Sequence, residues 1–120
     1  MTTVQTLVNA AADALGMPVY PAPARGGFPC AVYRFTTGAS DGSYADSRFE
    51  IRIFAGTASA VQDGMQKLRR TLVRDGDSGV LADEGGNLLI RQTDEGSGAG
   101  YLHDCGIYFM KAGFDVRGRA

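Results

Sequence analysis

The chain has 120 residues, of which 44% are hydrophobic, and its 12 basic and 13 acidic side chains give a net charge of −1. A chain of this length is expected to build one core, because two cores would each fall below the size that folds stably alone. The balanced charge argues against a basic face that holds a nucleic-acid backbone, and no apolar run approaches the ~20 residues of a membrane-spanning helix. We therefore expect one soluble domain over residues 1–120, made in the cytoplasm without a signal peptide.

A helix is predicted near the N-terminus, because Thr2 and Gln5 have the spacing of a capping box, in which each side chain accepts a hydrogen bond from the other's backbone amide. Apolar residues then recur every three or four positions and form one stripe, which comprises Val4, Leu7, Val8, Ala11 and Leu15. Gly16 and Pro18 are predicted to end the helix. The proline-bearing segment 19–29 is predicted to be an extended connector, since proline lacks an amide hydrogen and has a fixed φ.

Two strands are predicted next, with a polar segment between them. Residues 30–36 are rich in β-branched and aromatic side chains and are predicted to form the first strand. Residues 37–47 carry no aliphatic side chain larger than alanine, so we expect a mobile loop there. In the following run apolar and charged residues alternate, which predicts a half-buried strand of an antiparallel sheet. The apolar positions are Phe49, Ile51 and Ile53, and the charged positions are Arg48, Glu50 and Arg52.

A second helix is predicted after this strand, with a capping box formed by Ser59 and Gln62. Its apolar stripe comprises Val61, Met65, Leu68 and Leu72. The run of Asp, Gly and Ser at 75–79 is typical of a turn that follows a helix.

The C-terminal third is predicted to contain two more strands, at 88–91 and at about 105–116, separated by a flexible glycine-rich loop at 94–100. In the last strand Ile107 and Phe109 share one side, and Gly113 is expected to mark a bulge that switches the faces. Taken together, the elements predict an α+β fold in which two helices pack on one face of an antiparallel sheet of about four strands. The other face is expected to be charged or shared with a neighbouring subunit. Large aromatic residues that two short helices could not cover also indicate oligomerisation: Tyr20, Tyr33, Phe35, Phe54 and Tyr108.

No catalytic, metal or cofactor site is predicted from the sequence. The most suggestive cluster is His103, Asp104 and Cys105, but neighbours in a strand point to opposite faces, so the carboxylate could not orient the imidazole. Cys30 and Cys105 are both expected to be buried free thiols. One histidine and two distant cysteines give no paired metal-ligand spacing, and the glycines at 96–100 are followed by neither a helix nor a lysine.

The order of the elements resembles the tail terminator, or tail completion, proteins of long-tailed phages. The resemblance covers nearly the whole chain, and its strongest local match is the strand with the pattern P-x-x-V-Y-R at 29–34, followed by the alternating strand at 48–53 and a helix that begins at about 58. It implies a small α+β protein that forms a ring, commonly of six subunits, on the last ring of tail-tube proteins. There the ring stops tube growth and presents a surface to the head connector, with nucleic acid passing only through its lumen. No reaction and no cofactor are implied.

On this hypothesis two groups of residues make the contacts. The residues expected to face a partner are Ser40, Asp41, Tyr44, Asp46 and Glu95. The residues expected to lie between subunits are Arg48, Glu50, Arg52, Arg70 and Arg74. Three alternatives stay open: another neck component such as a head-closure or head-tail joining protein, a small ligand-binding or enzymatic α+β domain that uses His103 and Cys105, and a monomeric interaction module unrelated to phage.

Overall fold

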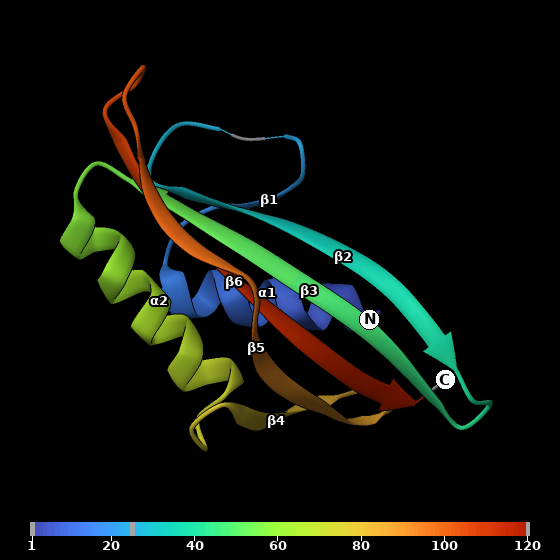
Figure 1. Ribbon diagram of the computed structural model, residues 1–120. Coiled ribbons are helices and arrows are strands. Elements are labelled where there is room, and N and C mark those ends of the chain that lie inside the picture. Colours follow the sequence, from blue (N-terminus) through green and yellow to red (C-terminus); the bar gives the residue numbers. More distant parts are fainter. Residues whose placement is uncertain (1, 25, 120) are drawn as a thin grey trace.

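The computed structural model describes residues 2–24 and 26–119, and it shows one twisted sheet with both helices packed against one face (Figure 1). The elements in chain order are α1 (Thr3–Leu15), β1 (Val19–Pro21), β2 (Cys30–Ser40), β3 (Tyr44–Ala55), α2 (Ala58–Leu72), β4 (Ser78–Asp83), β5 (Gly86–Leu102) and β6 (Ile107–Arg119). Within the described residues the sheet has six strands in the order β1-β2-β3-β6-β5-β4. The predicted α+β class is confirmed, whereas the prediction of about four strands understates the sheet.

The first helix forms as its sequence predicts. Thr2 Oγ1 accepts from the Gln5 amide at 3.2 Å, and Gln5 Oε1 accepts from the Thr2 amide at 2.8 Å, so the capping box is present. Gly16 ends the helix in the left-handed region with φ 65°, which a residue without Cβ adopts at little cost.

The N-cap of the second helix lies two residues before the predicted one. Thr57 is the N-cap, and its hydroxyl accepts from the Ala60 amide at 3.2 Å, so the capping box predicted at Ser59 and Gln62 is wrong. Thr57 and Ser59 both carry a hydroxyl group of the kind that caps helices, and Thr57 is the N-cap in the structure. The predicted apolar stripe is confirmed, because Val61, Met65, Leu68 and Leu72 are all buried.

The polar segment 37–47 is not a loop but the outer half of a β2–β3 hairpin. Thr37 pairs with Ser47, and Ser40 pairs with Ala45. Only residues 41–43 form the turn, in which Asp41 Oδ1 accepts from the amides of Ser43 and Tyr44. Backbone pairing orders this segment without apolar burial, and composition alone does not reveal such pairing.

Two further predictions for the connections change. The connector 19–29, of which residue 25 lies outside the described residues, has no helix among the described residues, but its first three residues form β1, which pairs in parallel with β2. The expected loop 94–100 lies inside β5, where the register against β6 shifts between Thr93 and Gly98. The bulge is therefore in β5, and Gly113 of β6 stays in register opposite both Glu50 and Thr93.

The main core lies between the helices and one face of the sheet. It contains the alternating apolar residues of β3, together with Phe114 from β6 and Leu68 from α2, all of which are at most 1% exposed. A second, smaller cluster lies on the opposite face, where Cys30 packs with Phe54 and Ile107. Cys30 is thus a buried thiol as predicted, but Cys105 is exposed, because it lies in the turn between β5 and β6 rather than in a strand.

The close packing of β4 against the end of α2 gives a direct test of the fold. A Cβ added to Gly79 would lie 2.2 Å from the Leu72 carbonyl oxygen, so Gly79→Ala must displace backbone. We expect this change to lower the free energy of unfolding by about 1–3 kcal/mol, measured by urea denaturation. Gly85→Ala is the matched control, because no atom lies within 4 Å of its added Cβ, and equal stability of the two variants would contradict the packing.

Candidate functional site

The face of the sheet that the helices leave uncovered is the main candidate for function, and we call it the open face. Residues directly opposite each other on neighbouring strands share a face. Glu50 of β3 therefore lies beside Arg34 of β2, and Arg52 of β3 lies beside Lys111 of β6. The face carries charged side chains on β2, β3 and β6, which is one of the two possibilities expected for it.

One end of the open face is a trough of about 850 Å³ that crosses five strands. A single row of paired residues runs through its lining, from β2 to β4: Thr36, Arg48, Asp115, Arg91 and Ser78. Because five adjacent strands line one hollow, the sheet is concave here on the side away from the helices. Two large apolar side chains, Val80 and Leu89, lie in the trough and are 51% and 52% exposed.

Ion pairs within the subunit hold two of the three arginines that line the trough, Arg48 and Arg117. Arg48 contacts Asp115 at 3.0 Å, donates to Thr93 Oγ1 at 3.0 Å, and also donates to the Glu95 carbonyl. Arg117 contacts Asp46 through two hydrogen bonds of 2.8 and 3.1 Å. These contacts fix the direction of both guanidinium groups, so the trough presents arranged charges rather than free ones.

The Asp46–Arg117 pair makes a pH-dependent contribution to stability. The hydrogen bond from Arg117 lowers the pKa of Asp46 below its ordinary value. A carboxyl group whose pKa is lower in the folded state stabilises the fold above its unfolded pKa, and this contribution is lost as pH falls through the folded pKa. We expect Asp46→Asn to be slightly less stable than the wild type near neutral pH, with no difference at strongly acidic pH. Urea denaturation at both pH values measures this, and a difference that grew on acidification would contradict the pairing.

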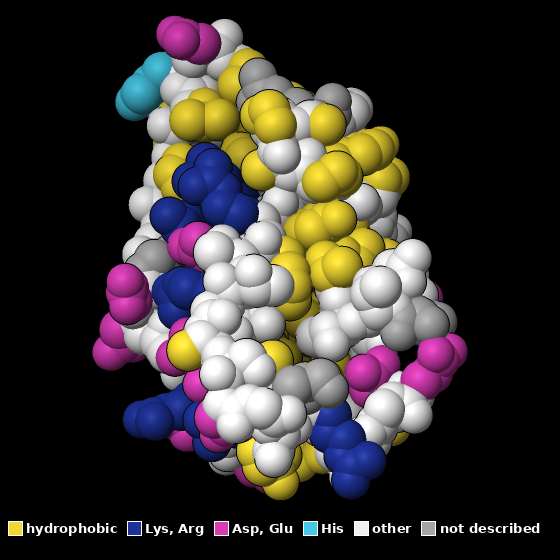
Figure 2. Space-filling model, turned by 90° about the vertical axis from the view of Figure 1, so that its right-hand side faces the viewer, with side chains coloured by type: hydrophobic (Ala, Val, Ile, Leu, Met, Phe, Trp, Pro, Cys, Tyr) yellow, Lys and Arg dark blue, Asp and Glu magenta, His cyan; other side chains and the backbone are white. Residues whose placement is uncertain are grey.

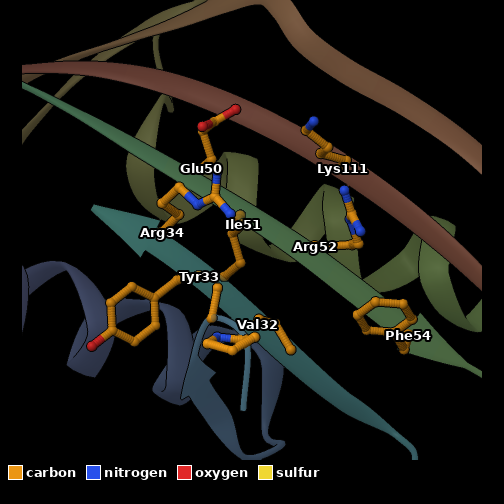
Figure 3. A pocket seen from close by; sticks show the side chains of 10 residues that line it. Val32, Tyr33, Arg34, Glu50, Ile51, Arg52, Phe54 and Lys111 are labelled. Atoms are coloured by element: carbon orange, nitrogen blue, oxygen red, sulfur yellow. The ribbon is translucent and has the colours of Figure 1, made fainter. Parts of the chain in front are cut away.

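The other end of the open face holds a second hollow of about 470 Å³ (Figure 3). Three cationic side chains line it, Arg34, Arg52 and Lys111, with Glu50 as the one carboxylate among its lining residues. Figure 3 shows Arg52 and Lys111 next to each other on adjacent strands, while Arg34 lies near Glu50. The Arg52 guanidinium also lies over the Phe109 ring, 5.6 Å from its centroid. This end therefore carries a net positive charge and suits an anionic group on a partner.

The residues predicted to face a partner lie in two places. Ser40, Asp41 and Tyr44 lie at or beside the hairpin turn, with Tyr44 49% exposed and its ring 5.9 Å from the Arg117 guanidinium. Asp46 lies on the same hairpin, in the trough. Glu95 does not lie on the hairpin. It lies in the part of β5 where the register against β6 shifts.

The residues predicted to lie between subunits are also divided. Arg48, Glu50 and Arg52 line the open face on β3. Arg70 and Arg74 are exposed at the C-terminal end of α2, where they border a small hollow next to Arg69. Within the described residues, the arginines at the end of α2 and the charged residues of β3 do not share one surface.

Several open-face residues were not singled out from the sequence. Arg34, Lys111, Val80 and Leu89 contribute charge or exposed apolar surface to the two hollows. The alternation at 88–91 carries a signal for Leu89, since Leu88 and Ile90 are buried and the residue between them must face the other way. The aromatic residues expected to be uncovered are mostly not, because Phe54 is buried and the other four are half-buried.

The turn between β5 and β6 holds the residues of the enzymatic alternative. His103 and Cys105 are both exposed there. The His103 ring packs edge-on against Tyr101 with ring centroids 4.9 Å apart, and the Cys105 thiol donates weakly to the Leu102 carbonyl at 3.9 Å. Neither contact supplies a base to the thiol. Across residues 2–24 and 26–119 no three potential metal ligands cluster, and no helix has the length and apolar character to cross a membrane.

No protein-family model matches this sequence, and no curated protein matches it. Among solved structures, the chain is similar to a protein in the structure described as the virion of a native gene transfer agent (GTA) particle. The two align with a TM-score of 0.62 over 98% of this chain and 92% of that chain, at 16% sequence identity. At this identity the likeness concerns the fold. The chain therefore shares its fold, over nearly its whole length, with a protein of a GTA virion.

Proposed function

We propose that this protein is a structural component of a phage-like virion and that it acts through protein contacts. The observation that carries the proposal is the fold shared over 98% of the chain with a protein of a GTA virion. The open face adds support, because a concave surface with ordered ion pairs, exposed apolar residues and a cationic hollow is suited to contacts with other proteins.

Within the virion, the proposed role is that of a tail terminator. Several copies, commonly six, form a ring on the end of the tail tube, stop its growth and join the tail to the head connector. The order of helices and strands supports this role, since it resembles that of tail terminator proteins. A ring requires two different complementary surfaces on each subunit, and this chain offers several distinct ones: the open face, the hairpin turn and the end of α2.

The proposed mechanism is steric capping, with no reaction and no cofactor. Each contact can be weak, because a ring presents the same contact several times to a partner of matching symmetry. The exposed position of His103 and Cys105 in a turn supports a contact role over a catalytic one, since catalysis by a thiol needs a base within hydrogen-bond reach.

Deletion of the coding sequence from the genome that produces the particles tests this role. We expect electron microscopy of the lysate to show filled heads and separate tails, with tube lengths no longer uniform, and complementation with the wild-type sequence to restore joined particles. Tails of uniform length beside heads that have lost their nucleic acid would indicate a head-closure protein instead. Normal particles in the deletion strain would refute a virion role.

A further inference from the structure

One edge of the sheet lacks a neighbouring strand over most of its length. β1 pairs with β2 only at residues 31–33, so within the described residues the β2 segment 34–40 has no strand on its outer side. Hydrogen bonds made by β2 where it runs beside β1 show which of its backbone groups point outward. The Ala31 amide donates to the Pro18 carbonyl, and the Tyr33 carbonyl accepts from the Ala22 amide. By alternation, Phe35 and Thr37 direct their amides and carbonyls towards the same empty side.

The first part of this edge, residues 34–37, lacks the features that prevent strands from pairing with other chains, whereas the register of β2 against β3 shifts between Thr37 and Ser40. Proteins protect exposed edges with lysine, proline, bulges or short strands. The segment 34–40 contains no lysine and no proline, and Arg34 is its one charged residue. The uncovered part of β5 also has a register shift, and in addition it carries Asp94 and Glu95. Residues 34–37 of β2 are thus less protected against pairing than the uncovered part of β5.

Apolar surface accompanies the same edge. Seen from the β2 side of the molecule, hydrophobic side chains form a band with a group of Lys and Arg beside it (Figure 2). Half-buried hydrophobic residues of α1, β1 and β2 pack against the core from this side, and they include Val8, Val19, Tyr33 and Phe35. A strand added here would cover apolar side chains as well as pair backbone groups.

Charge indicates that the added strand comes from a second copy of this chain. At the opposite edge of the sheet, β4 and its flanking turns span residues 74–85, which contain four carboxylates and one basic residue, Arg74. The β2 edge has the reverse character, since residues 26–40 contain Arg34 and no acidic residue, and the cationic hollow with Arg52 and Lys111 lies beside it. The two edges of one subunit are therefore complementary in charge, which favours contact between unlike edges of neighbouring copies.

Direction and length also match. Each of the pairs β2–β3, β3–β6, β6–β5 and β5–β4 is antiparallel, so β2, β6 and β4 run in the same direction. Rotation about an axis along the strands therefore brings β4 of one copy beside β2 of the next as a parallel pair. The free part of β2 has seven residues and β4 has six. In such an arrangement the concave open face lies inside and the helices outside.

We propose that copies of this protein assemble head to tail by pairing residues 34–40 of β2 with β4 of the next copy, which makes one continuous sheet around a ring. The inference rests on the proposed assembly function and specifies its contact. With matched centres and faces, Arg34 lies opposite Ser78 and Thr36 lies opposite Val80, which places Arg34 near Asp75, because Asp75 lines the trough together with Ser78.

Disulfide cross-linking tests this pairing in the full-length chain carrying Cys105→Ser. Thr36→Cys combined with Val80→Cys, or with Ala82→Cys for a shift of two residues, introduces thiols on the same face of the two edges. After oxidation of the assembled protein we expect a ladder of covalent oligomers on a denaturing gel, because each subunit links to two neighbours. Each single cysteine variant can give dimers at most, and Thr36→Cys with Gln66→Cys on the exposed side of α2 should give no ladder.

Native mass spectrometry of the same samples, alone and with tail-tube protein, distinguishes a failure of the edge pairing from a failure of the assembly role. An oligomer without a ladder from either pair would overturn the edge pairing and leave the assembly role intact, whereas the absence of any oligomer in both conditions would count against the assembly role itself. A charge swap gives a second test of the edge pairing. Arg34→Glu and Asp75→Arg should each reduce the oligomeric fraction, and the double variant should restore it. Equal fractions in all three would contradict the pairing.

Discussion

Replacing Phe49 by alanine is expected to lower the free energy of unfolding by about 3–5 kcal/mol, which is the typical effect of removing a buried phenylalanine side chain. Phe49 lies in the middle of β3 and is 0% exposed. It lies opposite Phe35 on one side and Phe114 on the other, and its ring centroid is 5.9 Å from that of Tyr33. The loss would therefore open a cavity where three strands meet the helices.

Guanidinium denaturation of the purified variant measures this effect, with Leu89→Ala as the control. Leu89 is also a large apolar strand residue, but it is half exposed in the trough, so its replacement should change stability by about 0.5 kcal/mol or less. Equal losses for the two variants would mean that the open face is covered or that the core lies elsewhere.

Shortening the β2–β3 hairpin is expected to abolish the joining of tails to heads while leaving the fold intact. The variant replaces residues 39–45 by Asn-Gly, a pair that closes two-residue hairpins. It removes the turn and the exposed Tyr44 ring but keeps the pairing of Thr37 with Ser47. All of the removed residues lie outside the hydrophobic core, so we expect stability within about 1 kcal/mol of the wild type.

Complementation of the deletion strain with this variant measures its function, and circular dichroism of the purified protein checks its fold. Gln62→Ala, an exposed change on α2 away from the hollow at the end of that helix, serves as the control and should restore normal particles. Normal particles from a folded hairpin variant would rule out the hairpin turn as a docking surface.

The sequence predicts those elements whose side chains alternate or recur with a clear period. β3 and both helices carry such patterns. The apolar residues predicted to be buried in β3 and α2 are buried, and in α1 Leu7, Ala11 and Leu15 are buried whereas Val4 and Val8 are half-buried. The polar residues 37–40, 44–47 and 98–100 carry no such pattern, and they lie in strands because they pair with a neighbouring strand. β1 is too short for a pattern, since it has three residues, and it forms only because β2 lies beside it.

The candidate site, like the fold, could be predicted from the sequence only in part. The charged face of β3 follows from its alternation, so Arg48, Glu50 and Arg52 could be placed on the open face in advance. The hydrogen-bond partners of these residues could not be predicted, because Arg48, for example, bonds to Asp115, which is 67 positions away in the chain. Likewise, the trough exists only because five strands from distant parts of the sequence curve together, and no local pattern encodes that curvature.

The account depends most on the protein being part of the finished particle in several copies, and quantitative mass spectrometry of purified particles tests this directly. We predict that the chain is present at a fixed number of copies per particle, commonly six, relative to proteins of known copy number in the head. Its absence from purified particles, or an amount well below one ring per particle, would contradict the account.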